Sequence, residues 1–150
     1  MRVRSELETI PGRAAGAMLA GLPPATGYRV IVKPLRYREK PHLSAWTDFD
    51  QHEIVLQVPQ PFFAFGEIVP YAAKRRPGKG MRFIWMTEGV TFRTPREVLR
   101  FLYLHEWMHW YLKERLGRGA SAETACDRFA LRNYRRRVVR EEDGLVALAR

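Results

Sequence analysis

The chain of 150 residues contains one cysteine, Cys126, so no disulfide can form within it. A chain of this kind is typical of a reducing compartment, and we expect a cytoplasmic protein. Long apolar runs are also missing, since no stretch approaches the roughly 18 apolar residues of a membrane-spanning helix. Arg2 and Arg4 precede an apolar stretch at 14–20, but that stretch is too weak for a signal peptide. We therefore expect neither a membrane span nor export.

Acidic residues are scarce relative to basic ones, and the net charge is +10. Such a charge favours nucleic acid, anionic surfaces or acidic substrates as partners, or it serves solubility alone. A hydrophobic content of 46% excludes a disordered chain. Neither an internal repeat nor a linker divides the sequence, so we expect a single domain over residues 1–150.

Turn-forming residues divide the first ninety positions into one helix and three strands. The helix is interrupted near Pro11 and Gly12, and Pro59 ends the second strand. Residues 59–70 are aromatic and proline-rich and permit no assignment. The predicted segments are a helix at 5–20, strands at 28–32, 53–58 and 82–86, a loop at 41–50 and a basic loop at 74–80.

A well-specified helix follows. Thr94 is placed to cap it, Pro95 occupies the first helical position and Glu97 the third, which is a capping box. The helix should run to about Leu116, with Gly117 suited to the left-handed stop. Ser121 can cap a further helix that extends from about Ala122 into residues 135–137. The order of elements predicts an α+β fold, in which two C-terminal helices pack on a small mixed sheet that follows an N-terminal helix.

His105 and His109 lie four residues apart on the capped helix and therefore project from one face. Two neutral imidazoles in this arrangement can bind one Zn²⁺. Glu106 is offset by about 100° around the helix axis, which suits a general base that acts on water beside the metal. The alternative is that both histidines are core residues satisfied by hydrogen bonds.

A catalytic zinc needs a third protein ligand, and no histidine follows His109. Glu123 is the best candidate, because it comes after a glycine-rich turn and lies in the first turn of a new helix. Asp127 lies one turn further on, where it could accept a hydrogen bond from a zinc-bound histidine. Alternatively, both acids are ordinary surface residues. Cys126 is a competing ligand, although a buried cysteine is usually inert packing.

Residues 105–109 (His-Glu-Trp-Met-His) and 123–130 (Glu-Thr-Ala-Cys-Asp-Arg-Phe-Ala) together resemble the gluzincin branch of the zincin metallopeptidases. The pattern is most similar to ImmA/IrrE-type and CAAX-prenyl-protease-like enzymes, whose second helix reads Glu-x-x-Ala-Asp/Asn-x-Phe-Ala. This chain departs from it at Cys126, where alanine is usual. The resemblance spans residues 94–132, about a quarter of the chain. The membrane-embedded relatives have spanning helices that this chain lacks, so a minimal soluble form is the nearer comparison.

The resemblance implies a zincin-like fold with an active-site helix and a C-terminal helix that carries the glutamate. It implies that His105, His109 and Glu123 bind zinc, that Glu106 is the general base and that Asp127 supports a histidine ligand. It also implies that an edge strand ahead of the active-site helix binds an extended substrate, and 53–58 or 82–86 could be that strand.

Two functions follow from these patterns. The first is a soluble zinc metallopeptidase that hydrolyses a peptide or protein substrate by means of a metal-activated water. The second is a nucleic-acid-associated binding protein on a zincin scaffold, with little or no hydrolysis. Its candidate contacts belong to the basic loop and to an i,i+4 stripe on the last predicted helix: Arg75, Arg76, Lys79, Arg132, Arg136 and Arg140.

Overall fold

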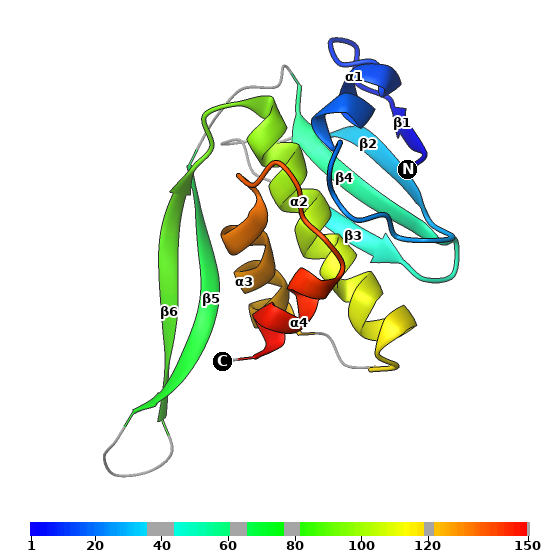
Figure 1. The fold of residues 1–150 in the computed structure, drawn as a ribbon. Coiled ribbons are helices and arrows are strands. Elements are labelled where there is room, and N and C mark those ends of the chain that lie inside the picture. Colours follow the sequence, from blue (N-terminus) through cyan, green and yellow to red (C-terminus); the bar gives the residue numbers. More distant parts are fainter. Residues whose placement is uncertain (36–43, 61–65, 77–81, 119–121, 150) are drawn as a thin grey trace.

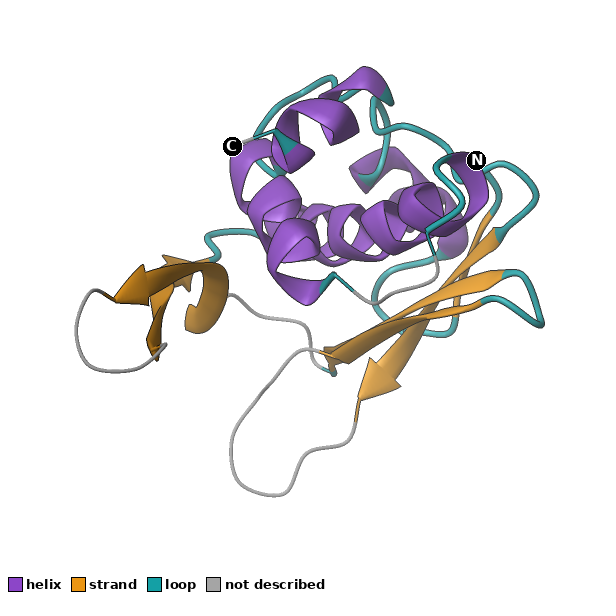
Figure 2. Cartoon of the chain, turned by 90° about the horizontal axis from the view of Figure 1, so that it is seen from below, coloured by secondary structure: helices purple, strands orange, loops and turns teal. Residues whose placement is uncertain are grey.

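The computed structural model describes residues 1–35, 44–60, 66–76, 82–118 and 122–149 (Figure 1). It is an α+β structure in which helices gather on one side of a four-stranded sheet, with a separate two-stranded hairpin beside them (Figure 2). No helix among the described residues is long and apolar enough to cross a membrane.

The four-stranded sheet has the strand order β1-β2-β4-β3. β1 (Val3–Ser5), β2 (Arg29–Leu35) and β4 (Glu53–Pro59) are parallel, and β3 (Ser44–Asp48) runs antiparallel to β4. Three successive residues are buried in the middle of β2, and three in β4, as is typical of inner parallel strands. β3 lies at the edge of the sheet and is partly exposed.

The central helix α2 (Pro95–Trp110) lies between this sheet and the helix α3 (Glu123–Asn133) (Figure 1). It is buried on most sides, which accounts for its apolar residues around nearly the whole axis. The predicted cap is present: Thr94 Oγ1 accepts a hydrogen bond from the Glu97 amide at 3.2 Å. The Glu97 carboxylate accepts a hydrogen bond from the backbone amide of Arg93 at 3.2 Å. In the predicted capping box this bond would come from the amide of Thr94, so the donor is shifted by one residue.

The predicted end of this helix is confirmed. After Trp110 the chain widens into a π-helical turn, Tyr111–Arg115, in which the Leu116 amide donates to the Tyr111 carbonyl at 3.1 Å. Gly117 then takes a φ of +63°, the left-handed conformation that favours glycine.

The remaining elements cover α2. α1 (Gly12–Met18) packs at the N-terminal edge of the sheet, while α3 (Glu123–Asn133) and α4 (Glu142–Leu148) pack at the opposite side of α2. β5 (Gly66–Arg76) and β6 (Arg82–Thr91) form the antiparallel hairpin, and β5 lies along α3. Trp107 of α2 stacks on Phe129 of α3 with ring centroids 5.2 Å apart, so it joins the two helices.

Several predicted boundaries are wrong. Of the predicted helix at 5–20, only Gly12–Met18 is helical and forms α1, while Ser5 ends β1 and residues 6–11 are irregular. Pro11 lacks an amide hydrogen and disfavours helix at the residue before it, so the helix begins only after it. The predicted loop at 41–50 contains β3, and the unassigned stretch at 59–70 contains the start of β5. Ser121, the predicted cap of α3, lies outside the described residues, as does the tip of the basic loop.

Candidate metal centre

Two histidines of α2 and one glutamate of α3 meet beside the edge of the sheet. The Nε2 atoms of His105 and His109 lie 3.3 Å apart, as their four-residue spacing on one helix predicts. Glu123, in the first turn of α3, approaches both: its Oε2 lies 3.1 Å from His105 Nε2, and its Oε1 lies 3.0 Å from His109 Nε2. The structure therefore brings together the three predicted ligands from two separate helices.

The spacing of these atoms can be compared with a zinc site. Ligand atoms arranged tetrahedrally about 2.0–2.2 Å from Zn²⁺ lie about 3.3–3.6 Å from one another. The two imidazole nitrogens are separated by 3.3 Å, which is in that range. The two oxygens of Glu123 lie at 3.1 and 3.0 Å, each from a different imidazole nitrogen, which is within a few tenths of an ångström of it. Two imidazoles and one carboxylate are also a donor set that zinc accepts at catalytic sites. The donor set and its spacing fit a zinc ion.

Asp127 orients one of the histidines. Its Oδ1 accepts a hydrogen bond from His105 Nδ1 at 2.7 Å, which leaves Nε2 directed toward His109 and Glu123. Because Asp127 lies four residues after Glu123 on α3, one helical face delivers both carboxylates to the same imidazole. The hydrogen bond anticipated from the sequence is present.

Glu106 lies beside His105 and lines the same cleft as the three predicted ligands. Its side chain is buried, and its Oε2 is 3.7 Å from His105 Nε2. Thr47 of β3 donates a hydrogen bond from Oγ1 to Glu106 Oε1 at 3.0 Å. Burial raises the pKa of Glu106 to about 7, although His105 and the Thr47 hydrogen bond oppose the shift. A carboxylate in this range can both accept and return a proton near neutral pH.

Thr47 is a site residue that the sequence analysis missed, because residues 41–50 were expected to form a loop. A signal was present. Residues 44–48 precede a short polar turn and the strongly predicted strand of β4, which is the pattern of a hairpin. The turn residue His52 takes a φ of +55°.

The two histidines have opposite acid–base behaviour. Burial disfavours protonated His105, but the hydrogen bonds to Asp127 and Glu123 outweigh it and raise the pKa of His105 to about 10. Burial, and then the charge of His105, lower the pKa of His109. One proton is therefore held at His105 and shared with the surrounding carboxylates.

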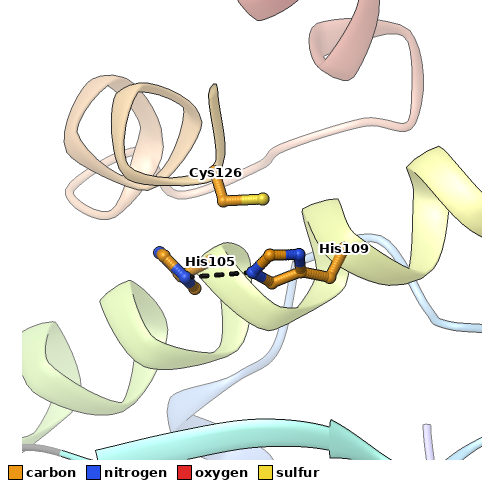
Figure 3. A group of neighbouring side chains, drawn as sticks. All are labelled: His105, His109 and Cys126. Carbon is orange, nitrogen blue, oxygen red and sulfur yellow. Dashed lines mark hydrogen bonds between the residues drawn. The ribbon is translucent and has the colours of Figure 1, made fainter. Parts of the chain in front are cut away.

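Cys126 is the other candidate ligand near the histidines. Its side chain projects from α3 toward both imidazole rings (Figure 3), and its sulfur lies with one nitrogen of each ring in a group whose atoms are all within 4.8 Å. The residue is fully buried, and burial raises the pKa of its thiol. Glu123 differs in that its carboxylate oxygens already lie at 3.0 and 3.1 Å from the ring nitrogens.

A cleft of about 330 Å³ opens in front of these groups. Its walls come from β3 on one side and from α2 with the following turn on the other. Trp46 of β3 is 41% exposed at this cleft, and the cations Lys113 and Arg118 line it as well. Lys113 Nζ lies 4.1 Å from the ring centroid of Phe49, another lining residue. The site is thus open to a substrate and has an apolar wall and a basic wall.

The edge strand beside the site differs from the two candidates in the sequence. β4 cannot serve, because β2 and β3 occupy both of its edges. β6 belongs to the separate hairpin and does not line the cleft among the described residues. The edge strand at the site is β3, which has only five residues and was expected to be part of a loop.

The predicted arginine stripe is not formed. α3 ends at Asn133, so only Arg132 of the stripe lies on this helix. Arg136 follows the helix and pairs with Asp143 at 3.3 Å, while the exposed Arg140 precedes α4. Arg75 and Arg76 lie at the end of β5, and Lys79 lies outside the described residues.

Comparison with models of protein families, with curated proteins and with solved structures found no match to this chain.

Proposed function

We propose that this chain is a zinc-dependent metallopeptidase of the zincin type, with His105, His109 and Glu123 as the metal ligands. The observation that carries the proposal is the convergence of these three groups beside a buried carboxylate at an open cleft. Core histidines that only satisfied hydrogen bonds would need neither a cleft nor a second acid in front of them.

Each residue of the site has its own role in the proposed hydrolysis. When bound, zinc supplies a Lewis acid that polarises a carbonyl oxygen and lowers the pKa of water to about 7. Glu106 accepts the proton that water loses on attacking the peptide carbonyl, and returns it to the leaving nitrogen. Since Thr47 occupies Oε1, the proton is carried by Oε2. Asp127 keeps the His105 ring in the orientation and tautomer that a metal ligand needs.

The cleft supports an extended peptide as substrate. The outer edge of β3 has backbone groups available along the cleft, and a peptide strand can add to such an edge. Trp46 offers an apolar surface for one substrate side chain. Apart from Glu106 and Glu123, which have roles at the metal, the acidic and basic side chains that line the cleft in the described part of the chain are Lys113 and Arg118. We therefore propose that the enzyme prefers acidic residues close to the scissile bond.

One experiment tests the function as a whole. The protein, purified without chelator, is incubated with a peptide library from a digested proteome, and new termini are identified by mass spectrometry. We expect cleavage that a chelator abolishes and that zinc restores, with acidic residues enriched beside the cut. Glu106→Gln should retain about one zinc per chain but lose hydrolysis. Glu114→Gln, an exposed glutamate on the turn after α2, is the matched control and should cleave normally.

The third ligand is tested separately by metal content. Glu123→Ala should lose most of the bound zinc, whereas Cys126→Ala should retain it. The opposite result would assign the third position to Cys126. Loss of zinc in both variants would describe a closed four-ligand site without an open position, and hence a structural zinc in place of a catalytic one.

A further inference from the structure

A second cavity lies at the far end of α2 from the metal centre and is lined by residues around the start of α2 and just after the end of α3. Both helices can be located in Figure 1. It measures about 560 Å³, and five of its seven lining residues are arginines. Arg96 lies nine positions before His105 on the same helix, about 13 Å along the axis and on the opposite face. The cavity therefore does not extend the peptide cleft. The lining residues are Arg93, Arg96, Glu97, Arg100, Tyr134, Arg135 and Arg137.

Most of the positive charge in this cavity is unbalanced. Among the described residues Glu97 is the single acid that lines it, and its carboxylate pairs with Arg135 at 3.3 Å. Within the part of the chain that the structure describes, the guanidinium groups of Arg93, Arg96 and Arg137 form no ion pair. The positive end of the α2 dipole adds to their potential, because the cavity surrounds the first turn of this helix.

A buried arginine, Arg100, holds the two sides of the cavity together. Arg100 is 2% exposed and donates hydrogen bonds to the carbonyls of Met18, Ala20, Arg136 and Arg137. No carboxylate of the described residues forms an ion pair with it. Its two bonds to residues 136 and 137 fix the segment after α3 against α2. Burial, and then the charge of Arg96, lower the pKa of Arg100. This brace keeps Arg137 opposite Arg93 and Arg96 across the cavity.

The lining identifies the ligand chemistry. Guanidinium groups match phosphate oxygens in charge and geometry. Several guanidinium groups in one cavity suit a chain of phosphate groups better than a single phosphate. The net charge of +10 over the whole chain also favours a polyanion as the ligand. Tyr134 is the aromatic residue of the lining, and its buried ring packs on Phe92 and Phe101, which leaves it unsuited to stacking with a base.

We propose that this arginine cavity binds the phosphate backbone of a nucleic acid, without regard to base sequence. The site is independent of the metal centre and requires no hydrolysis. Nucleic acid bound here would lie on the face of α2 opposite the peptide cleft and would leave that cleft accessible to a protein substrate.

The test compares two triple variants that each remove three positive charges. The cavity variant is Arg93→Ala/Arg96→Ala/Arg137→Ala. The control variant is Arg2→Ala/Arg13→Ala/Lys33→Ala, which changes three basic residues outside the cavity. Arg2 and Arg13 are exposed and Lys33 is partly exposed, and none of the three side chains forms an ion pair among the described residues. Binding of fluorescein-labelled single-stranded and duplex DNA of two unrelated sequences is measured by anisotropy over a range of salt concentrations. Far-UV circular dichroism and thermal unfolding verify that both variants fold.

We expect the wild type to bind every DNA at low salt, with affinity that falls steeply as salt rises. The cavity variant should lose at least about tenfold in affinity, and its salt slope should decrease by about two to three, since three phosphate contacts are lost and each contributes about 0.7–0.9. The control variant should lose less than about threefold. Equal losses in the two variants would show an effect of net charge alone and overturn the proposal. So would absence of DNA binding at low salt, or binding of a phosphopeptide in place of DNA.

Discussion

Asp127 Oδ1 accepts a hydrogen bond from His105 Nδ1 at 2.7 Å, across the interface between α2 and α3. The same helix α3 places Glu123 Oε2 at 3.1 Å from the other nitrogen of that imidazole. A single histidine is therefore held at both nitrogens by one neighbouring helix. This arrangement couples the docking of α3 on α2 to the orientation of the candidate metal ligand.

The first prediction concerns this hydrogen bond. Asp127→Asn should weaken zinc affinity by about 10–100-fold, because the amide no longer fixes the ring or raises its basicity. Zinc affinity is measured by competition with a chromophoric chelator. Asp143→Asn makes the same chemical change at the Arg136 ion pair, away from the metal centre, and should leave affinity unchanged. Unaltered affinity in Asp127→Asn would show that Asp127 plays no part in metal binding.

The second prediction concerns the proton on His105. In the metal-free protein its pKa is raised to about 10, so the ring is protonated at pH 8, whereas the lowered pKa of His109 leaves that ring neutral. Zinc needs neutral imidazoles, and its binding at pH 8 should therefore release about one proton from His105. Calorimetry in buffers of different ionisation enthalpy measures this number. Affinity should rise by about tenfold per pH unit between the ordinary pKa of histidine and 10.

Raised basicity of His105 also has a consequence for the metal-free fold. Because the pKa of His105 is higher in the folded than in the unfolded chain, its protonation stabilises the folded state. This stabilisation is fully present below the ordinary pKa of 6.5 and is lost as pH rises through about 10.

The second prediction is contradicted if zinc binding at pH 8 releases almost no protons, because His105 would then be neutral in the metal-free protein.

The third prediction concerns Thr47 and the pH dependence of hydrolysis. The hydrogen bond from Thr47 stabilises ionised Glu106 and lowers its pKa, so Thr47→Val should raise that pKa. Because the base must be ionised to accept a proton, the acid limb of kcat/KM against pH should move to higher pH, by about one unit for a lost charged hydrogen bond. Thr47→Ser retains the hydroxyl and should restore the wild-type profile. A loss of rate without a shift of the limb would assign Thr47 a structural role only.

The fourth prediction concerns two glycines that share a φ of +85° but differ in their surroundings. A Cβ added to Gly27 meets nothing within 4 Å, whereas one added to Gly21 would lie 2.2 Å from the carbonyl oxygen of Arg137. Gly27→Ala should therefore cost only the left-handed strain of about 1–2 kcal/mol in free energy of unfolding. Gly21→Ala should cost about 1–3 kcal/mol more, because backbone must move. Urea denaturation measures the free energy of unfolding of both variants. Equal losses in the two variants would show that the backbone around Arg137 can move at little energetic cost.

Prediction from sequence succeeded where the structure depends on neighbours in the chain. The cap at Thr94, the stop at Gly117 and the common face of His105 and His109 all follow from hydrogen bonds and side-chain periodicity within one helix. The end of α3 was placed too late, because the run of arginines after Asn133 has good helix propensity. In the structure that segment leaves the helix, and its carbonyls accept hydrogen bonds from Arg100.

The sequence by itself determined the central capped helix, its two histidines on one face, the α+β class and the candidate residues on the following helix. Only the tertiary structure decided that β3 is the edge strand at the cleft, that Thr47 contacts Glu106 and that arginines from 93–100 and 135–137 surround one cavity. The physical reason is the range of the interactions. Helix periodicity and caps act over about four residues, whereas strand pairing and the packing of α2 against α3 join positions far apart in the chain.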